Sequence, residues 1–96
     1  TPKAHFKIPF SDILYFETQP GTRQIVLVGV AQRMEFTGQL QDIAAMDNRL
    51  FRSHRAYLVN TNNIEQIDKV NNVIIFKKQS TCLISRRKVK ALINIL

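Results

Sequence analysis

The feature that most constrains this chain is the stretch LFRSHRAYLVN at residues 50–60. Its centre holds three side chains rich in hydrogen-bond donors, Arg52, His54 and Arg55. Its apolar anchors are Phe51, Tyr57 and Val59. Cationic groups are almost never buried without a partner, whereas aromatic and aliphatic groups favour burial. We therefore expect a segment that is anchored to a core and presents arginine and histidine outward, toward an anionic partner.

The positive charge is concentrated at the C-terminal end. The chain carries a formal net charge of +7 and a pI of about 10.1. Residues 1–68 contain equal numbers of basic and acidic side chains, whereas residues 69–96 contain seven basic side chains and no acidic one. A solvated surface usually mixes both signs, so a block of one sign indicates an anionic partner such as nucleic acid, an acidic membrane or an acidic protein.

Length and composition favour one small cytoplasmic domain that covers residues 1–96. A chain of 96 residues is long enough for one modest core. The single cysteine, Cys82, cannot form a disulfide within the chain and is typical of a reducing compartment. No apolar run approaches the roughly 20 residues of a membrane-spanning helix, and we expect no signal peptide.

Short apolar runs separated by turn residues predict a chain dominated by strands. Strands are expected over residues 1–9, 13–17, 24–28, 33–36, 64–68, 73–76 and 81–84. The predicted turns include Pro20-Gly21, Asn71-Asn72 and Lys78-Gln79-Ser80, and the last three strands form a meander. Apolar residues occupy both parities of residues 24–28, which predicts burial on both faces of that strand.

Two helices are expected. Helical spacing of apolar residues predicts the first over residues 39–47. The second follows Ser85 as a possible cap, with a docking stripe at Val89, Leu92, Ile93 and Leu96. Positive charge in the first turn of a helix opposes its macrodipole. Such charge suits a phosphate or a guanine edge, and the residues concerned are Arg86, Arg87 and Lys88.

The motif at residues 50–60, followed by Asn63-Ile64 and preceded by Gly38 and Leu40, resembles the signature of the LytTR family. The resemblance extends from IPFSDILYFE near the start to the basic end of the chain. It implies a mostly β fold, an elongated stack of small antiparallel sheets with one or two short helices. It also implies the DNA-binding output domain of a bacterial response regulator, of the type that controls quorum sensing, competence or bacteriocin production.

The resemblance implies three places of contact with DNA. They hold Arg23 in the first, His54 and Arg55 in the second, and Arg86 and Arg87 in the third. The outer two would enter successive major grooves, and the central one would lie against the minor groove between them. Arg87 stands at the base-reading position, and we expect Lys88 and Lys90 to hold phosphates. Arginine suits guanine because its fork matches O6 and N7.

The implied partners are double-stranded DNA at paired repeats, a second copy through the full-length regulator, and RNA polymerase. No membrane partner and no cofactor are expected, and no receiver domain lies within residues 1–96. The alternative is a small basic RNA-binding protein, and a hydrolase is a distant third. His5 and His54 lack a cysteine or acid at ligand spacing, and the adjacent Ser53-His54 pair does not suit nucleophilic catalysis. We expect core positions for Cys82 and for the aromatic residues Tyr15, Phe16, Phe51 and Phe76.

Overall fold

The computed structural model describes residues 8–77 and 80–96. Within these ranges the strands are β1 (Ile13–Thr18), β2 (Gln24–Gly29), β3 (Arg33–Thr37), β4 (Leu50–His54), β5 (Tyr57–Asn60), β6 (Ile64–Asp68), β7 (Val73–Phe76) and β8 (Thr81–Leu83). The α-helices are α1 (Leu40–Ala44) and α2 (Val89–Ile95). Short 3-10 turns are η1 (Phe10–Asp12), η2 (Thr61–Asn63) and η4 (Arg86–Lys88).

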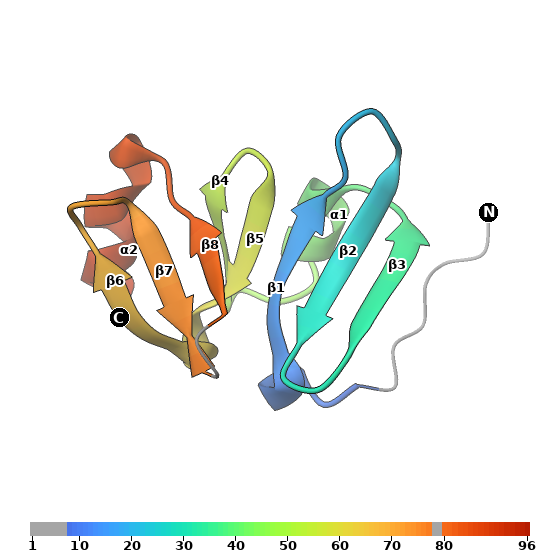
Figure 1. The fold of residues 1–96 in the computed structure, drawn as a ribbon, viewed down its shortest axis with the longest axis horizontal. Coiled ribbons are helices and arrows are strands. Elements are labelled where there is room, and N and C mark those ends of the chain that lie inside the picture. The colour runs from blue at the N-terminus through green and yellow to red at the C-terminus, as the bar shows by residue number, and fades with distance from the viewer. Residues whose placement is uncertain (1–7, 78–79) are drawn as a thin grey trace.

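The described strands form two antiparallel sheets (Figure 1). The larger has the order β3-β2-β1-β5-β4, and the smaller has the order β6-β7-β8. β1 is the centre of the larger sheet because it pairs with β2 on one side and with β5 on the other. The principal extents are 40 × 25 × 22 Å. The mostly β, elongated fold with few short helices is therefore confirmed.

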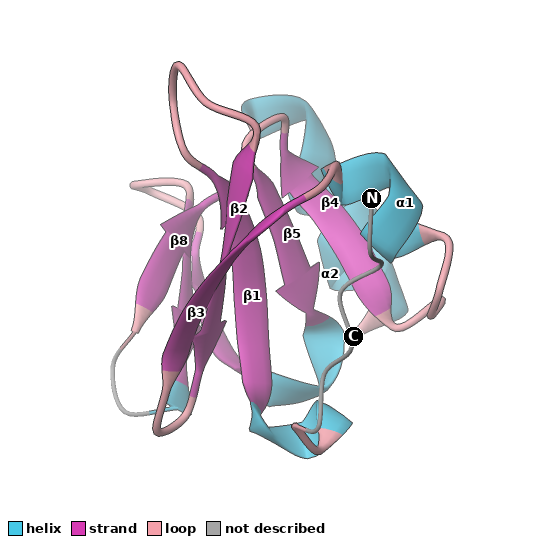
Figure 2. Ribbon diagram, turned by 90° about the vertical axis from the view of Figure 1, so that its right-hand side faces the viewer, coloured by secondary structure: helices cyan, strands magenta, loops and turns pink. Residues whose placement is uncertain are grey.

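The larger sheet is buried on both faces, by α1 on one side (Figure 2) and by the smaller sheet on the other. The core beneath α1 consists of Ile13, Phe16, Ile25, Leu27, Leu40, Ile43 and Leu58. The inter-sheet core consists of Leu14, Tyr15, Val59, Ile74, Phe76, Cys82, Ile84 and Leu92. The predicted two-sided burial of β2 is confirmed, since Ile25 and Leu27 lie under α1 while Val28 packs against the inter-sheet core.

The motif at residues 50–60 is a β-hairpin, β4–β5, which the sequence analysis did not predict. A β-bulge interrupts its register, with Phe51 opposite Val59 and His54 opposite Tyr57. The cationic residues obscure the period-two pattern that would reveal such strands, and the bulge shifts it again. The apolar anchors behave as expected, because Val59 is fully buried and Phe51 and Tyr57 pack against the inter-sheet core.

Both helices differ from the prediction. α1 ends at Ala44, well before residue 47, and the Asp47 carboxylate accepts a hydrogen bond from the backbone N–H of Arg49. Such local side-chain bonds compete with the helical pattern. In α2 only part of the predicted stripe docks, because Leu92 is fully buried while Ile93 and Leu96 are 38% and 59% exposed.

The predicted turns are retained where the structure describes them. Asn72 adopts a φ of 55°, and the Asp68 carboxylate accepts bonds from the N–H groups of Val70 and Asn71. The prediction of a turn at residues 78–80 falls partly on positions 78 and 79, outside the described residues. Residues 1–7 of the first predicted strand also lie outside them, and positions 8 and 9 form no strand.

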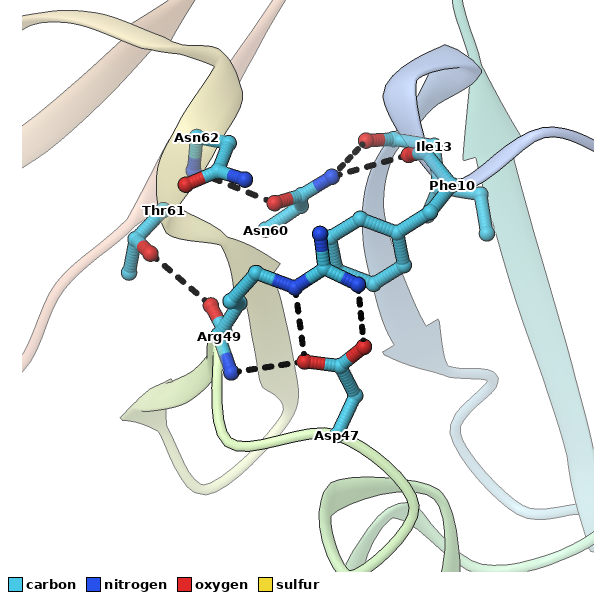
Figure 3. Close-up of polar contacts among 7 residues, drawn as sticks. All are labelled: Phe10, Ile13, Asp47, Arg49, Asn60, Thr61 and Asn62. Atoms are coloured by element: carbon cyan, nitrogen blue, oxygen red, sulfur yellow. Dashed lines mark hydrogen bonds and ion pairs between the residues drawn. The ribbon is translucent and has the colours of Figure 1, made fainter.

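The region around η1 is held to the end of the β4–β5 hairpin by two buried asparagines. Asn60 Nδ2 donates to the carbonyl oxygens of Phe10 and Ile13 at 3.0 and 2.9 Å (Figure 3). Asn63 Nδ2 donates to those of Ser11 and Ile13 at 2.9 and 2.7 Å. These four bonds satisfy groups that would otherwise be costly to bury. We call this set of bonds the asparagine clasp.

An exposed arginine stacks on Phe10, whose carbonyl oxygen belongs to the asparagine clasp. The Arg49 guanidinium lies 3.8 Å from the ring centroid of Phe10 and donates from Nε and Nη2 to the two carboxylate oxygens of Asp47 at 2.9 and 2.6 Å (Figure 3). These bonds lower the pKa of Asp47 from its ordinary 3.8 to about 2. The stacked, bidentate geometry is one that lysine cannot supply.

Candidate nucleic-acid interface

The three predicted contact places lie along one long side of the molecule. The loop between β1 and β2, the turn between β4 and β5, and the segment that leads from β8 into η4 all lie at the upper side of Figure 1. They come from both sheets. The topology therefore aligns three loops that are far apart in the sequence.

The central place is the β4–β5 turn, where Arg55 is exposed and His54 is half-buried. The Nδ1 atom of His54 accepts a hydrogen bond from the N–H of Ala56 at 3.1 Å. Its ring meets the edge of Tyr57, with centroids 5.7 Å apart. In this arrangement Nδ1 is committed to the turn, and the other ring nitrogen, Nε2, is the one that can donate outward.

The third place is η4, in which Arg86, Arg87 and Lys88 are all exposed. The prediction that they occupy the first turn of an α-helix is wrong, because α2 begins only at Val89. The Ser85 side chain makes no capping bond; instead its carbonyl oxygen accepts the N–H of Lys88 at 2.8 Å. The tight 3-10 turn places the three cations ahead of α2, while Lys90 is an exposed residue of α2 itself.

The central and third places share one hollow of about 350 Å³. Its lining residues are Arg52, His54, Arg55, Ser85, Arg87 and Lys88. The structure thus brings together four of the predicted contact residues, while Arg86 and Lys90 are not among the lining residues. A hollow lined by so many cationic groups and no acidic one suits phosphate or the acceptor edge of a base.

Arg23, the first predicted place, lies at a separate hollow of about 630 Å³ between the start of β2 and α1. Arg23 is exposed, and its carbonyl oxygen accepts the N–H of Gly38 at 3.1 Å, which ties the loop to the end of β3. Its hollow also holds Gln24, Gln39 and one acid, Asp42. It is therefore less positive than the hollow between the other two places.

Arg52 lines both hollows, although the sequence did not mark it as a contact residue. Its guanidinium donates from Nε to the carbonyl oxygen of His54 at 3.2 Å and from Nη2 to that of Arg55 at 2.6 Å. The signal in the sequence was its place in the motif, two residues before His54, but only the structure shows where its side chain lies.

The predicted contact residues keep their positive charge available. Among the described residues the ion pairs are Arg33 with Glu17 and Arg49 with Asp47. Neither pair includes a predicted contact residue. The positive electrostatic field of the three loops is therefore not cancelled by these ion pairs, which favours attraction of a polyanion.

Other roles that the sequence raised concern catalysis, a reactive thiol, metal binding and a membrane span. Ser53 is fully buried and its Oγ donates to the carbonyl oxygen of Leu83 at 3.0 Å, so it cannot meet a substrate. Cys82 is buried as predicted, and burial raises the pKa of its thiol to about 12. No group of three His, Cys, Asp or Glu residues in the described part of the chain could hold a metal ion. Of the described helices, none has the length and apolar character needed to span a membrane.

Comparison with known proteins gives similarities of three kinds. The family model described as LytTr DNA-binding domain matches residues 3–96. Two relatives are named accessory gene regulator protein A, one from Staphylococcus epidermidis and one from Staphylococcus aureus. Each is 32% identical to this chain over 83 residues, which is 86% of this chain and 35% of the relative. The chain thus spans about a third of the length of these relatives. A solved LytTr DNA-binding domain from Bacillus cereus superposes with a TM-score of 0.77 at 18% identity, covering 92% of this chain and 84% of that one.

Proposed function

The chain belongs to the LytTr DNA-binding domain family, and from this premise we propose that it reads paired repeats in promoter DNA as the output domain of a two-component transcription regulator. The observation that carries the proposal is the alignment of three cation-bearing loops along one side of the molecule (Figure 1). The relatives named above are gene regulators by name, which supports a role in transcription, including the quorum-sensing type.

The dimensions suit B-DNA. The long axis of 40 Å is close to one helical turn, roughly 34–36 Å. The loop at Arg23 and the segment at Arg87 are proposed to enter successive major grooves on one face of the duplex. The turn at Arg55 is proposed to lie against the intervening minor groove, where arginine is favoured.

The residues divide into two proposed roles. Arg87 reads a base, because its guanidinium can bond O6 and N7 of guanine together. Lys88 and Lys90 hold phosphates as point charges, and Arg86, which lies outside the shared hollow, does the same. A second copy bound to the neighbouring repeat, brought there by the full-length regulator, and RNA polymerase complete the proposed assembly.

The test is selection of bound duplexes from a random pool, followed by competition. A repeat-containing duplex should emerge and should outcompete random duplex and RNA by at least about 10³. Equal competition by RNA would instead support the small basic RNA-binding protein. Enrichment of no sequence would contradict specific recognition.

A further inference from the structure

The β4–β5 turn has an unusual backbone for its length. His54 pairs with Tyr57, so the loop consists of two residues, Arg55 and Ala56. Two-residue hairpin loops usually adopt type I′ or II′ turns, which need positive φ and match the twist of the strands. Among the described residues only Asn72 and Gly21 have positive φ. The turn therefore lacks the conformation that makes a short hairpin loop self-supporting.

Hydrogen bonds made by two side chains of β4 hold the turn in place of that conformation. Arg52 donates to the carbonyl oxygens of His54 and Arg55, and the N–H of Ala56 donates to His54 Nδ1. The bonds from the guanidinium are charge-assisted and among the stronger hydrogen bonds in proteins. One planar fork thus joins the last residue of β4 to the first residue of the turn.

The bulge explains how Arg52 reaches the turn. Between the pairs Phe51–Val59 and His54–Tyr57, β4 contains two residues where β5 contains only Leu58. Bulges re-aim side chains and increase the local twist. Ser53 is buried and bonded to β8, and Arg52 is directed along the strand toward the carbonyl oxygens of the turn.

We propose that Arg52 is a positioning residue: it holds the β4–β5 turn so that Arg55 and His54 are presented to DNA, and it does not itself neutralise a phosphate. The proposal rests on the proposed function. Two of its guanidinium nitrogens are committed to internal carbonyl oxygens. A turn that is already ordered in the free protein binds without the entropic cost of ordering it.

The first experiment uses the free protein, without DNA. Hydrogen exchange at the Ala56 amide is compared in wild type, Arg52→Lys and Arg52→Gln. Lysine keeps the charge but lacks the fork, so both variants should exchange about tenfold faster at Ala56. Arg33→Gln on β3, whose side chain is 66% exposed, is the matched control and should leave Ala56 unchanged. Unchanged protection in Arg52→Lys would overturn the proposal.

The second experiment measures binding to the selected duplex at several salt concentrations. Both Arg52 variants should bind about tenfold more weakly with the wild-type salt slope. The loss should be smaller in the Arg55→Ala background, because a positioning residue acts through its targets and Arg55 is one of the two. If Arg52→Lys binds like wild type while Arg52→Gln loses about 0.9 from the salt slope, Arg52 is a phosphate contact and the proposal is wrong.

The two experiments distinguish failure of the proposed function from failure of the proposed role of Arg52. If wild type binds no duplex selectively, the proposed function fails, yet exchange at Ala56 still decides whether Arg52 orders the turn. If wild type binds and exchange is unaltered, only the role of Arg52 is wrong. Melting curves establish that each variant is folded, and should Arg52→Gln not fold, Arg52→Lys carries both measurements, since it retains the charge and the aliphatic stem.

Discussion

The backbone N–H of Ser85 donates to the carbonyl oxygen of Ser53 at 2.7 Å, and this bond links β4 to the segment that carries Arg87. On the opposite side of the hairpin, the N–H of Thr18 donates to the carbonyl oxygen of Ala56 at 3.0 Å. The β4–β5 hairpin is therefore joined by backbone bonds to both neighbouring loops. Backbone bonds therefore set the spacing of the three loops, whereas the proposed role of Arg52 concerns only the conformation of the central turn.

Arg87 and Lys90 should differ in how their loss affects binding. Arg87→Ala should cost about 1–3 kcal/mol on the selected duplex and little on random duplex, because a bidentate base contact is lost. Lys90→Ala should weaken all duplexes alike and lower the salt slope by about 0.9. Binding isotherms on the selected site and its single-base variants measure both. Equal loss on every duplex for Arg87→Ala would make it a phosphate contact and direct attention to Arg23 or Arg86.

DNA binding should depend strongly on salt concentration, because residues 69–96 contain seven basic residues and no acidic one. The logarithm of the association constant should fall with the logarithm of salt by about 0.9 for each phosphate contact. Fluorescence anisotropy between low and physiological salt provides the slope. Arg33→Ala, which removes a charge outside the three loops, should keep the wild-type slope. A flat dependence would exclude an electrostatic interface.

The aromatic residues should act on stability rather than on contact with DNA. Phe76 is fully buried, so Phe76→Ala should cost about 3–5 kcal/mol. Phe51 is only half-buried against the same core, and Phe51→Ala should cost less than Phe76→Ala. Urea unfolding gives both values. A Phe51→Ala protein with unchanged unfolding but no DNA binding would show that Phe51 stacks on a base.

Acid should weaken the fold through Asp47. Hydrogen bonds from Arg49 depress the pKa of Asp47 to about 2. The charged carboxylate therefore stabilises the folded state in full at pH values above its ordinary pKa of 3.8. That stabilisation is lost as the pH falls through about 2. The free energy of unfolding of wild type should therefore fall more between pH 4 and pH 2 than that of Asp47→Asn. Because the pair is exposed, high salt should reduce the difference. Parallel pH profiles would contradict the role of this pair.

Strands with uninterrupted apolar runs were predictable from the sequence. ILYFE predicts β1 and VIIF predicts β7, because short runs of β-branched and aromatic residues are typical of strands. The β4–β5 hairpin was not predictable in the same way, since Arg52, His54 and Arg55 interrupt its pattern. The resemblance identified this stretch as functional, but the hairpin is also held by contacts with β1 and β8, which lie far away in sequence.

The partners of buried polar groups were also beyond the sequence. Asn60 and Asn63 indicate a turn by composition, yet each of them binds the carbonyl oxygen of Ile13, at least 47 residues away. Likewise, nothing local shows that Arg52 binds the turn. Local propensity identifies elements, whereas the roles of Asn60 and Asn63 depend on distant carbonyl groups. The role of Arg52 depends on the bulge in β4, which directs it toward carbonyl groups two and three residues away.

The strand order has a consequence for how the chain folds. β1, β2 and β3 form a meander, and β6, β7 and β8 form another, so each can close over short loops. The pairing of β1 with β5 joins Glu17 to Tyr57, and the asparagine clasp spans a still greater length of chain. Contacts of such long range carry a larger loop-closure entropy and slow folding. We therefore expect the rate-limiting step to be the docking of β5 on β1, the same event that brings the three DNA-facing loops into line.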